Sequence, residues 1–153
     1  MTALELLARS GLRAGQRLLI VGATGGVGRF LCQLASQHGV RVIATGTAAD
    51  TPALRTLGAS SVVDYTAGLV SEQVRLQFPD GIDGLVDLVS DPATFGRYTE
   101  LVRAGGVALT TNYAASEQAM AQRRLRGGNF ALTANPSLLE RLGADTRSGF
   151  LIP

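Results

Sequence analysis

A glycine-rich segment, Gly22 to Gly28, carries the clearest chemistry in this sequence. It reads Gly-Ala-Thr-Gly-Gly-Val-Gly and directly follows an apolar run that ends at Val21. Its last six residues fit the pattern Ala-x-Gly-x-x-Gly, in which Ala23 stands at the place of the first glycine of a dinucleotide-binding fingerprint. Where such a loop opens a helix, free backbone N–H groups and a partial positive charge suit a phosphate. The segment therefore predicts a site for the pyrophosphate of a dinucleotide.

Each part of this loop has an expected role. Gly25 lets the backbone approach the pyrophosphate, and Gly28 lets the helix pack closely on the preceding strand. The alternative interpretation is a tight turn kept for packing alone, which the strand before the loop and the helix after it make the weaker one. The loop residues that we predict to bind the cofactor are Ala23, Thr24, Gly25, Gly26, Val27 and Gly28.

The end of the second predicted strand bears on the choice of dinucleotide. A site that prefers NAD usually carries an acidic residue there, which holds the ribose 2′-hydroxyl. This sequence has Thr45, Gly46 and Thr47 instead, which are neutral and small. We therefore expect NADP(H) to be favoured over NAD(H). Asp50 lies close enough to weaken this argument, and we interpret it as an N-cap or first-turn acid of a helix that starts at Thr51.

These segments need a scaffold, and the alternation of Val, Ile and Leu runs with helix-like runs predicts it. The fold class is α/β, a doubly wound, mainly parallel six-stranded Rossmann sheet with helices on both faces. We expect strands at Arg17 to Val21, Arg41 to Thr45, Ser61 to Asp64, Gly84 to Val89, Val107 to Thr111 and Asn129 to Thr133. We expect helices at Gly26 to His38, Thr51 to Leu57, Leu69 to Phe78, Ala93 to Val102 and Pro136 to Thr146.

Glycines are expected to end three of these helices: Gly39 the first, Gly58 the second and the pair Gly105-Gly106 the fourth. The polar stretch from Asn112 to Gly128 shows no strand pattern and predicts a loop or a short helix. A further helix, Thr2 to Ser10, is expected to precede the first strand and has no evident partner in the chain.

Composition excludes several classes of function. The chain holds one cysteine and one histidine, Cys32 and His38, too few for a zinc site, so we expect no metal. We interpret Cys32 as a buried small hydrophobe and His38 as a cap or favourable charge at a helix end. All 14 basic residues are arginine, so mechanisms that need a lysine are absent. The net charge of +2 and scattered arginines argue against nucleic acid. No apolar run is long enough for a membrane span or signal peptide, which predicts a cytoplasmic protein.

The chain resembles the coenzyme-binding domain of the medium-chain dehydrogenase/reductase superfamily, nearest its zinc-independent, quinone-oxidoreductase-like branch. The resemblance covers nearly all 153 residues and rests on four segments, GLRAGQRLLIVGATGGVGRFLCQLASQHGVRVIATG, LRTLGASSVVDY, GIDGLVDLVSD and LVRAGGVALTTN. It implies that Gly46 and Tyr65 contact the adenosine ribose and its 2′-phosphate. The branch often has a lysine a few residues after that glycine, where this chain has Asp50. The resemblance also implies a nicotinamide pocket lined by Val89, Ser90, Asp91, Thr111 and Asn112. Asp91, followed by a proline, is otherwise interpreted as a helix cap.

The resemblance further implies a separate substrate domain that this chain lacks. We therefore expect residues 1–153 to form one dinucleotide-binding domain, an excised or truncated part of a NADPH-dependent quinone or enone reductase. Alone it would bind nucleotide and turn over little, and no catalytic acid, base or nucleophile is assigned. Expected partners are the nicotinamide dinucleotide, the substrate domain and a second copy paired through the edge strand at Phe130, Ala131 and Leu132.

Two other interpretations stay open. The run from Gly22 to Arg29 also suits an atypical short-chain reductase, but such enzymes pair a tyrosine with a lysine four residues later. This chain has no lysine, so only a non-catalytic member of that class fits. The second alternative is a regulatory module that reports nucleotide state to a partner.

Overall fold

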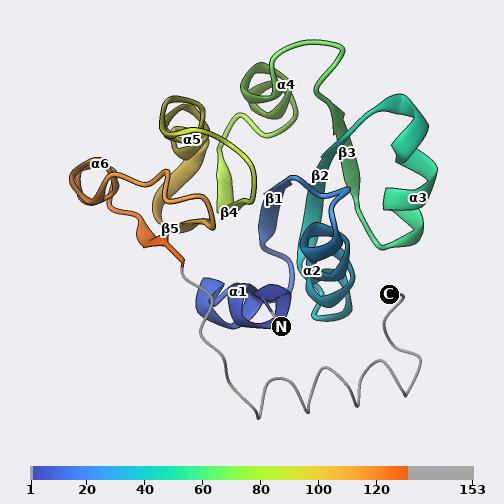
Figure 1. Cartoon of the computed structure of the whole chain (residues 1–153), viewed down its shortest axis with the longest axis horizontal. Coiled ribbons are helices and arrows are strands. Elements are labelled where there is room, and N and C mark those ends of the chain that lie inside the picture. The colour runs from blue at the N-terminus through green and yellow to red at the C-terminus, as the bar shows by residue number, and fades with distance from the viewer. Residues whose placement is uncertain (1, 131–153) are drawn as a thin grey trace.

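A parallel sheet forms the centre of the molecule. The computed structural model describes residues 2–130, and within them six strands lie in the order β3-β2-β1-β4-β5-β6, all parallel to their neighbours (Figure 1). The chain starts in the middle of the sheet, runs to one edge and then returns to build the other half. Strand order therefore reverses between β1 and β4, where open sheets of this kind bind ligands beyond the carboxyl ends of the strands.

The α/β class predicted from the sequence is confirmed, and most boundaries agree within two residues. The strands are β1 (Arg17–Val21), β2 (Arg41–Gly46), β3 (Ser61–Asp64), β4 (Ile82–Asp87), β5 (Val102–Thr110) and β6 (Arg126–Asn129). The helices are α1 (Thr2–Ser10), α2 (Gly26–Gln37), α3 (Thr51–Thr56), α4 (Val70–Gln77), α5 (Pro92–Thr99) and α6 (Glu117–Gln122), and a short 3-10 turn, η1 (Ala48–Asp50), precedes α3. The helix predicted at Pro136 to Thr146 lies outside the described residues.

Helices cover both faces of the sheet, as the alternation of buried side chains in β1 shows. Leu18 and Ile20 pack with α1, α2 and α3, whereas Leu19 and Val21 pack with α4, α5 and α6. All four side chains are buried. A central parallel strand is apolar on both sides because each side meets a helix layer. The two cores fix α2 relative to β1, and so fix the loop that joins them.

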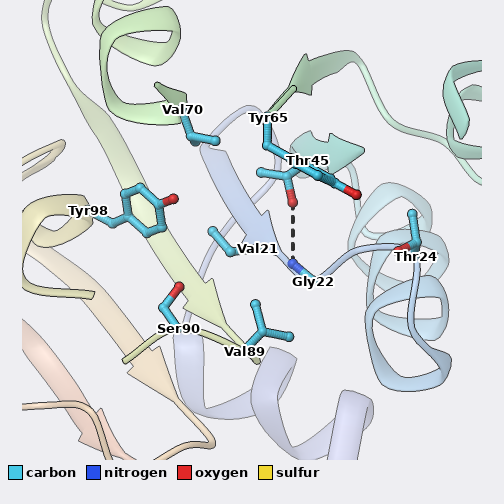
Figure 2. A pocket seen from close by; sticks show the side chains of 9 residues that line it. All are labelled: Val21, Gly22, Thr24, Thr45, Tyr65, Val70, Val89, Ser90 and Tyr98. Carbon is cyan, nitrogen blue, oxygen red and sulfur yellow. Dashed lines mark hydrogen bonds between the residues drawn. The ribbon is translucent and has the colours of Figure 1, made fainter. Parts of the chain in front are cut away.

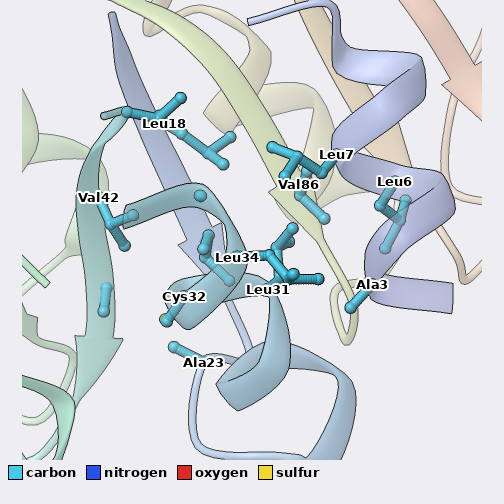
Figure 3. Packing of buried hydrophobic residues seen from close by; sticks show 14 of the residues in the cluster. Ala3, Leu6, Leu7, Leu18, Ala23, Leu31, Cys32, Leu34, Val42 and Val86 are labelled. Carbon is cyan, nitrogen blue, oxygen red and sulfur yellow. The ribbon is translucent and has the colours of Figure 1, made fainter. Parts of the chain in front are cut away.

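Helix α1 has a partner within the chain, so the expectation that it has none was wrong. It packs against α2 and β5, and Leu6 is 0% exposed in the core on that face. Figure 3 shows Leu6 and Leu7 of α1 beside Leu31 of α2 and Val86 of β4. The sequence pattern of α1 showed an apolar face but could not show that the adjacent sheet surface was free to receive it.

The pair Gly105-Gly106 lies inside β5, so the prediction that it ends the fourth helix was wrong. That helix, α5, ends earlier, at Thr99. At the start of β5 the register with β4 slips, because Ile82 pairs with Val102 while Gly84 pairs with Val107. A Cβ on Gly106 would lie 2.6 Å from the Asp83 carbonyl oxygen. The glycines therefore permit a bulge at this point of the strand.

The edge strand β6 begins three residues before the predicted strand and consists of Arg-Gly-Gly-Asn. It lies in the stretch that was predicted to contain no strand, although the short helix expected there is present as α6. Phe130, expected on a free edge, is 3% exposed and belongs to the core that includes α1. Ala131 and Leu132 lie outside the described residues, and pairing of two copies through this edge stays a prediction.

Candidate functional site

The glycine loop joins β1 to α2 by a tight turn. Gly22 has a positive φ of 91°, which favours glycine, and its carbonyl oxygen accepts a hydrogen bond from Gly25 N at 3.2 Å. The structure gives Gly28 the packing role that the sequence predicted for it. A Cβ on Gly28 would lie 2.2 Å from the Gly22 oxygen and 2.7 Å from the Ala23 Cα. Helix α2 therefore approaches the loop more closely than any side chain at position 28 would permit.

The outer surface of the same loop is open. Thr24, Gly25, Gly26 and Val27 are exposed, while Ala23 is fully buried beneath them. A Cβ on Gly26 would meet no atom within 4 Å. Gly25 is the N-cap of α2 and makes no side-chain cap, and the first turn of α2 contains no acidic residue. The first N–H groups of a helix have no partner within it, so this surface offers donors and a partial positive charge to an anion.

The end of β2 is shaped by Gly46 and Asp50. Gly46 is buried, and a Cβ there would lie 2.7 Å from Leu54 Cδ1. Asp50 Oδ2 accepts two hydrogen bonds from Thr47, one from its backbone N and one from its Oγ1, each at 2.9 Å. These bonds, together with the charge of Arg29, lower the pKa of Asp50. Asp50 precedes α3 as predicted, but its carboxylate does not cap that helix and turns back to Thr47.

A pocket with a volume of about 390 Å³ lies at the carboxyl ends of the strands. Its lining comes from β1, β2, α4, α5 and the segments that follow β1, β3 and β4. Figure 2 shows the side chains of this pocket around the turn at Gly22, whose N donates to Thr45 Oγ1 at 3.3 Å. The lining residues are Val21, Gly22, Thr24, Thr45, Tyr65, Val70, Val89, Ser90 and Tyr98.

Three of the residues predicted to bind the cofactor therefore share one cavity, although they come from distant segments. Thr24 follows β1, Tyr65 follows β3 and Ser90 follows β4. Tyr65 is 56% exposed and Ser90 is 9% exposed, so the tyrosine ring lies at the solvent side and the serine lies deeper. Val89, beside Ser90, is 63% exposed and presents an apolar side chain to the same cavity. The cavity thus combines apolar walls with a few hydroxyl groups, as ligand pockets usually do.

Asp87, at the end of β4, holds the segment that carries Val89 and Ser90, and sequence reasoning did not identify it. Its side chain is 0% exposed, and Oδ1 accepts hydrogen bonds from Val89 N at 3.1 Å and Ser90 N at 2.9 Å. Oδ2 has no hydrogen-bond partner among the described residues. A lone acidic residue at the end of the apolar run Gly84 to Val86 was the signal in the sequence that could have found it.

Thr111 and Asn112 follow β5, next to this segment. Asn112 Nδ2 donates to the Ser90 carbonyl oxygen at 3.1 Å and lies 3.5 Å from that of Val89. Thr111 N donates to the Asp87 carbonyl oxygen at 3.2 Å. Neither residue lines the 390 Å³ pocket, so the structure places them beside it and joined to its wall.

Tyr98 of α5 lines the pocket, and sequence reasoning did not identify it as a candidate binding residue. Its ring is half-buried, and in Figure 2 it lies across the cavity from Thr45 and Tyr65. Burial, and then the negative charge of Asp87, raise the pKa of its hydroxyl. The phenol therefore stays protonated at neutral pH and can donate a hydrogen bond into the cavity. Asp91, by contrast, is the helix cap it was interpreted as, because its Oδ1 accepts from Thr94 N at 2.8 Å.

The described residues do not offer a metal site. No group of three or more His, Cys, Asp or Glu side chains in residues 2–130 could hold an ion. Cys32 is buried against apolar residues, and burial raises the pKa of its thiol to about 12, which confirms its interpretation as a small hydrophobe. His38 follows the last residue of α2, where Nδ1 lies 2.8 Å from the Leu34 carbonyl oxygen. Within the same residues, no helix is long and apolar enough to cross a membrane.

Comparison with known proteins identifies the family of this chain. The family model described as zinc-binding dehydrogenase matches residues 26–135, which include α2 and every strand from β2 to β6. That match covers more than half of the chain. The chain is also 39% identical over 93 residues to the trans-enoyl reductase himH of Aspergillus japonicus, a stretch that is 60% of this chain and 27% of that protein.

Two further comparisons cover nearly the whole chain. The NADPH-dependent alkenal/one oxidoreductase of Arabidopsis thaliana, a chloroplastic protein, is 27% identical over 154 residues, which are 99% of this chain and 36% of that protein. The structure of the quinone oxidoreductase from Coxiella burnetii superposes with a TM-score of 0.87 at 24% identity, over 99% of this chain and 47% of that one. The chain thus spans less than half of the length of each of these proteins.

Proposed function

The chain belongs to the zinc-binding dehydrogenase family, and we propose that it is the coenzyme-binding domain of a NADPH-dependent reductase of quinones or enones. The observation that carries this proposal is the open glycine loop at the start of α2, beside a 390 Å³ pocket at the carboxyl ends of the strands. The loop and pocket lie at the point where strand order reverses, between β1 and β4. That is where dinucleotides bind in sheets of this topology.

The residues of this chain suit the parts of a dinucleotide. The backbone N–H groups of Gly26 and Val27 would bind the pyrophosphate, because these positions are exposed and begin a twelve-residue helix, whereas Gly25 N already donates to the Gly22 oxygen. The adenosine ribose would lie near the end of β2, where Gly46 and Thr47 form a neutral turn, and near Tyr65. When bound, the nicotinamide supplies or accepts a hydride.

The wall formed by the β4 and β5 ends would position the rest of the coenzyme. Ser90 and Val89 line the pocket, and Asn112 joins their carbonyl oxygens to the end of β5. Asp87 keeps that wall in place through the hydrogen bonds that its Oδ1 accepts. In this proposal Asp87 and Asn112 position the binding residues, and Thr111 extends the surface beside them.

Reduction of a quinone or enone is proposed from the relatives, one of which is named an NADPH-dependent alkenal/one oxidoreductase. The described residues around the pocket include no cluster of acid, base and nucleophile, and hydride transfer from a cofactor does not require one. The substrate would be held by a separate domain of the complete enzyme. The coenzyme would supply the reducing equivalents.

Calorimetric titration of the chain with NADPH and with NADH tests the proposal. Gly25→Asp places a carboxylate on the open loop surface, and we expect it to abolish binding through steric conflict and charge repulsion with the pyrophosphate. Gly96→Asp in α5 is the matched control, because a Cβ there also meets no atom within 4 Å and Gly96 does not line the pocket. Failure of the unmodified chain to bind either nucleotide at millimolar concentration, or binding that Gly25→Asp leaves intact, would overturn it.

A further inference from the structure

Arg29 and Asp50 line a second, smaller cavity beside the nucleotide pocket. Its volume is about 100 Å³, and Thr24 belongs to the lining of both cavities. Arg29 comes from the first turns of α2, and Asp50 ends the short turn that follows β2. One cation and one anion from separate segments therefore line the same cavity at the edge where β2 ends. The lining is completed by Ala53 and Leu54 of α3 and by Leu57, the residue after that helix.

The guanidinium of Arg29 is available to a ligand. Arg29 is exposed, and no ion pair joins it to a carboxylate among residues 2–130. The positive charge of Arg29 nevertheless acts on Asp50. It lowers the pKa of that carboxyl, although less than the two hydrogen bonds from Thr47 do. Arginine is suited to phosphate because its planar guanidinium donates two parallel hydrogen bonds.

The carboxylates at this edge already accept hydrogen bonds from nearby threonines. Asp50 accepts its two hydrogen bonds from Thr47, and Asp64, at the end of β3, accepts from Thr66 N at 2.8 Å and from the Thr66 hydroxyl. Both nevertheless keep their negative charge, because these hydrogen bonds lower the pKa of each carboxyl. An added phosphate at this edge would therefore meet repulsion unless a cation is placed between them.

We propose that Arg29 is the residue that selects the 2′-phosphate of NADP(H), and that Asp50 is the opposing charge that keeps this selectivity moderate. The inference rests on the proposed function, because it concerns the adenosine end of the same bound dinucleotide. In sheets of this topology, the end of β2 lies at the ribose 2′ position, where an acid favours the hydroxyl and a nearby arginine accommodates the phosphate. This chain carries both kinds of residue, and the arginine comes from α2 rather than from the segment after β2.

Titrations of Arg29→Gln with NADPH, NADH, 2′,5′-ADP and ADP test the assignment. Loss of a charge-assisted pair predicts an affinity for NADPH and 2′,5′-ADP that is lower by about ten- to hundredfold. Affinity for NADH and ADP should change by less than about threefold, because neither has a 2′-phosphate. Arg41→Gln is the matched control, since Arg41 is an exposed arginine at the opposite end of β2. It removes the same net charge and should leave all four affinities nearly unchanged.

Asp50→Asn supplies the second arm, because the amide keeps an acceptor for Thr47 and removes the charge. We expect a several-fold gain in affinity for NADPH and no gain for NADH. The assignment is overturned if Arg29→Gln leaves the ratio of NADPH to NADH affinity unchanged, or if Arg41→Gln lowers that ratio equally. In those results the nucleotides still bind, so they differ from failure of the proposed function, in which the unmodified chain binds neither.

Discussion

The contact between Gly28 of α2 and the loop before it permits a quantitative test of the site's architecture. In Gly28→Ala the new Cβ would start 2.2 Å from the Gly22 carbonyl oxygen, 2.7 Å from the Ala23 Cα and 3.0 Å from the Ala23 carbonyl carbon. All three atoms belong to the backbone, so no side chain can rotate away. Because non-bonded heavy atoms in contact normally lie about 3.5 Å apart, α2 must move away from the loop by about 1 Å.

The size of the effect follows from two opposing contributions. Overpacking of a well-packed site costs about 1–3 kcal/mol, and contacts this short with backbone place Gly28→Ala at the upper end. Replacing glycine by alanine within a helix stabilises the folded chain by up to about 1 kcal/mol, which offsets part of this cost. The expected net loss in the free energy of unfolding is therefore about 2 kcal/mol. With a urea dependence of about 2 kcal/mol per molar, the unfolding midpoint should fall by about 1 M.

Urea unfolding followed by circular dichroism measures this shift. Gly26→Ala is the control, because it makes the same chemical change two residues earlier, where a Cβ meets no atom within 4 Å. The control should unfold at the same urea concentration as the unmodified chain or slightly above it. If Gly28→Ala is as stable as Gly26→Ala, α2 does not approach the loop as closely as described and the steric reasoning is wrong.

Three further predictions concern the scaffold. Leu6→Ala should lower the free energy of unfolding by about 2–5 kcal/mol, because Leu6 is fully buried; a loss below about 0.5 kcal/mol in urea titration would show that α1 is not docked. Cys32, whose pKa burial raises to about 12, should react with a thiol reagent at pH 8 only after unfolding in urea, and rapid labelling of the folded chain would contradict its burial. The hydrogen bond from Thr94 lowers the pKa of Asp91, so its stabilisation is present at neutral pH and is lost as pH falls below about 4. Asp91→Ala should therefore lower the urea midpoint more at pH 7 than at pH 3, and an equal decrease at both pH values would refute this linkage.

The central strands could be predicted from the sequence because their side chains define them. In β1 every residue from Leu18 to Val21 is buried, and a short, uninterrupted apolar run of this kind is typical of a parallel strand between two helix layers. The first glycine-ended helix was predicted for a similar local reason. Gly39, with a φ of 80°, ends α2 where the apolar periodicity stops.

The edge strand β6 could not be predicted in the same way, because backbone pairing defines it. β6 contains Arg126, two glycines and Asn129, and it is held by its register with Val107 to Thr110 of β5. Gly127 has a φ of 97°, and a Cβ there would lie 2.4 Å from the Ala108 carbonyl oxygen. Such a strand has no apolar alternation to detect, so its glycines resembled those of a loop.

The candidate binding residues show the same difference between features that local sequence reveals and features that depend on tertiary packing. The shape of the glycine loop could be predicted because glycine positions reveal tight backbone turns and close approaches directly, and its binding role stays a prediction. Tyr98 was missed because it reaches the pocket only through the way α5 packs on the sheet. Asp87 left a signal, a lone acid in an apolar run, but its role depends on hydrogen bonds to the next turn of chain. Side chains that act through tertiary packing leave little trace in local sequence.

The choice between NADP and NAD shows why the sequence argument was incomplete. The neutral turn after β2 was taken as evidence for NADP, but packing also favours a small residue there, since a Cβ on Gly46 would lie 2.7 Å from the end of the Leu54 side chain. A side chain at position 46 would require Leu54 to shift whichever coenzyme binds, so the glycine there is weaker evidence for the phosphate than its neutrality suggests. The charges that we propose to discriminate are those of Arg29 and Asp50, which are 21 positions apart in the sequence and line one cavity in the fold. If the proposed assignment holds, selectivity depends on the balance between these two side chains more than on the residue type at the end of β2.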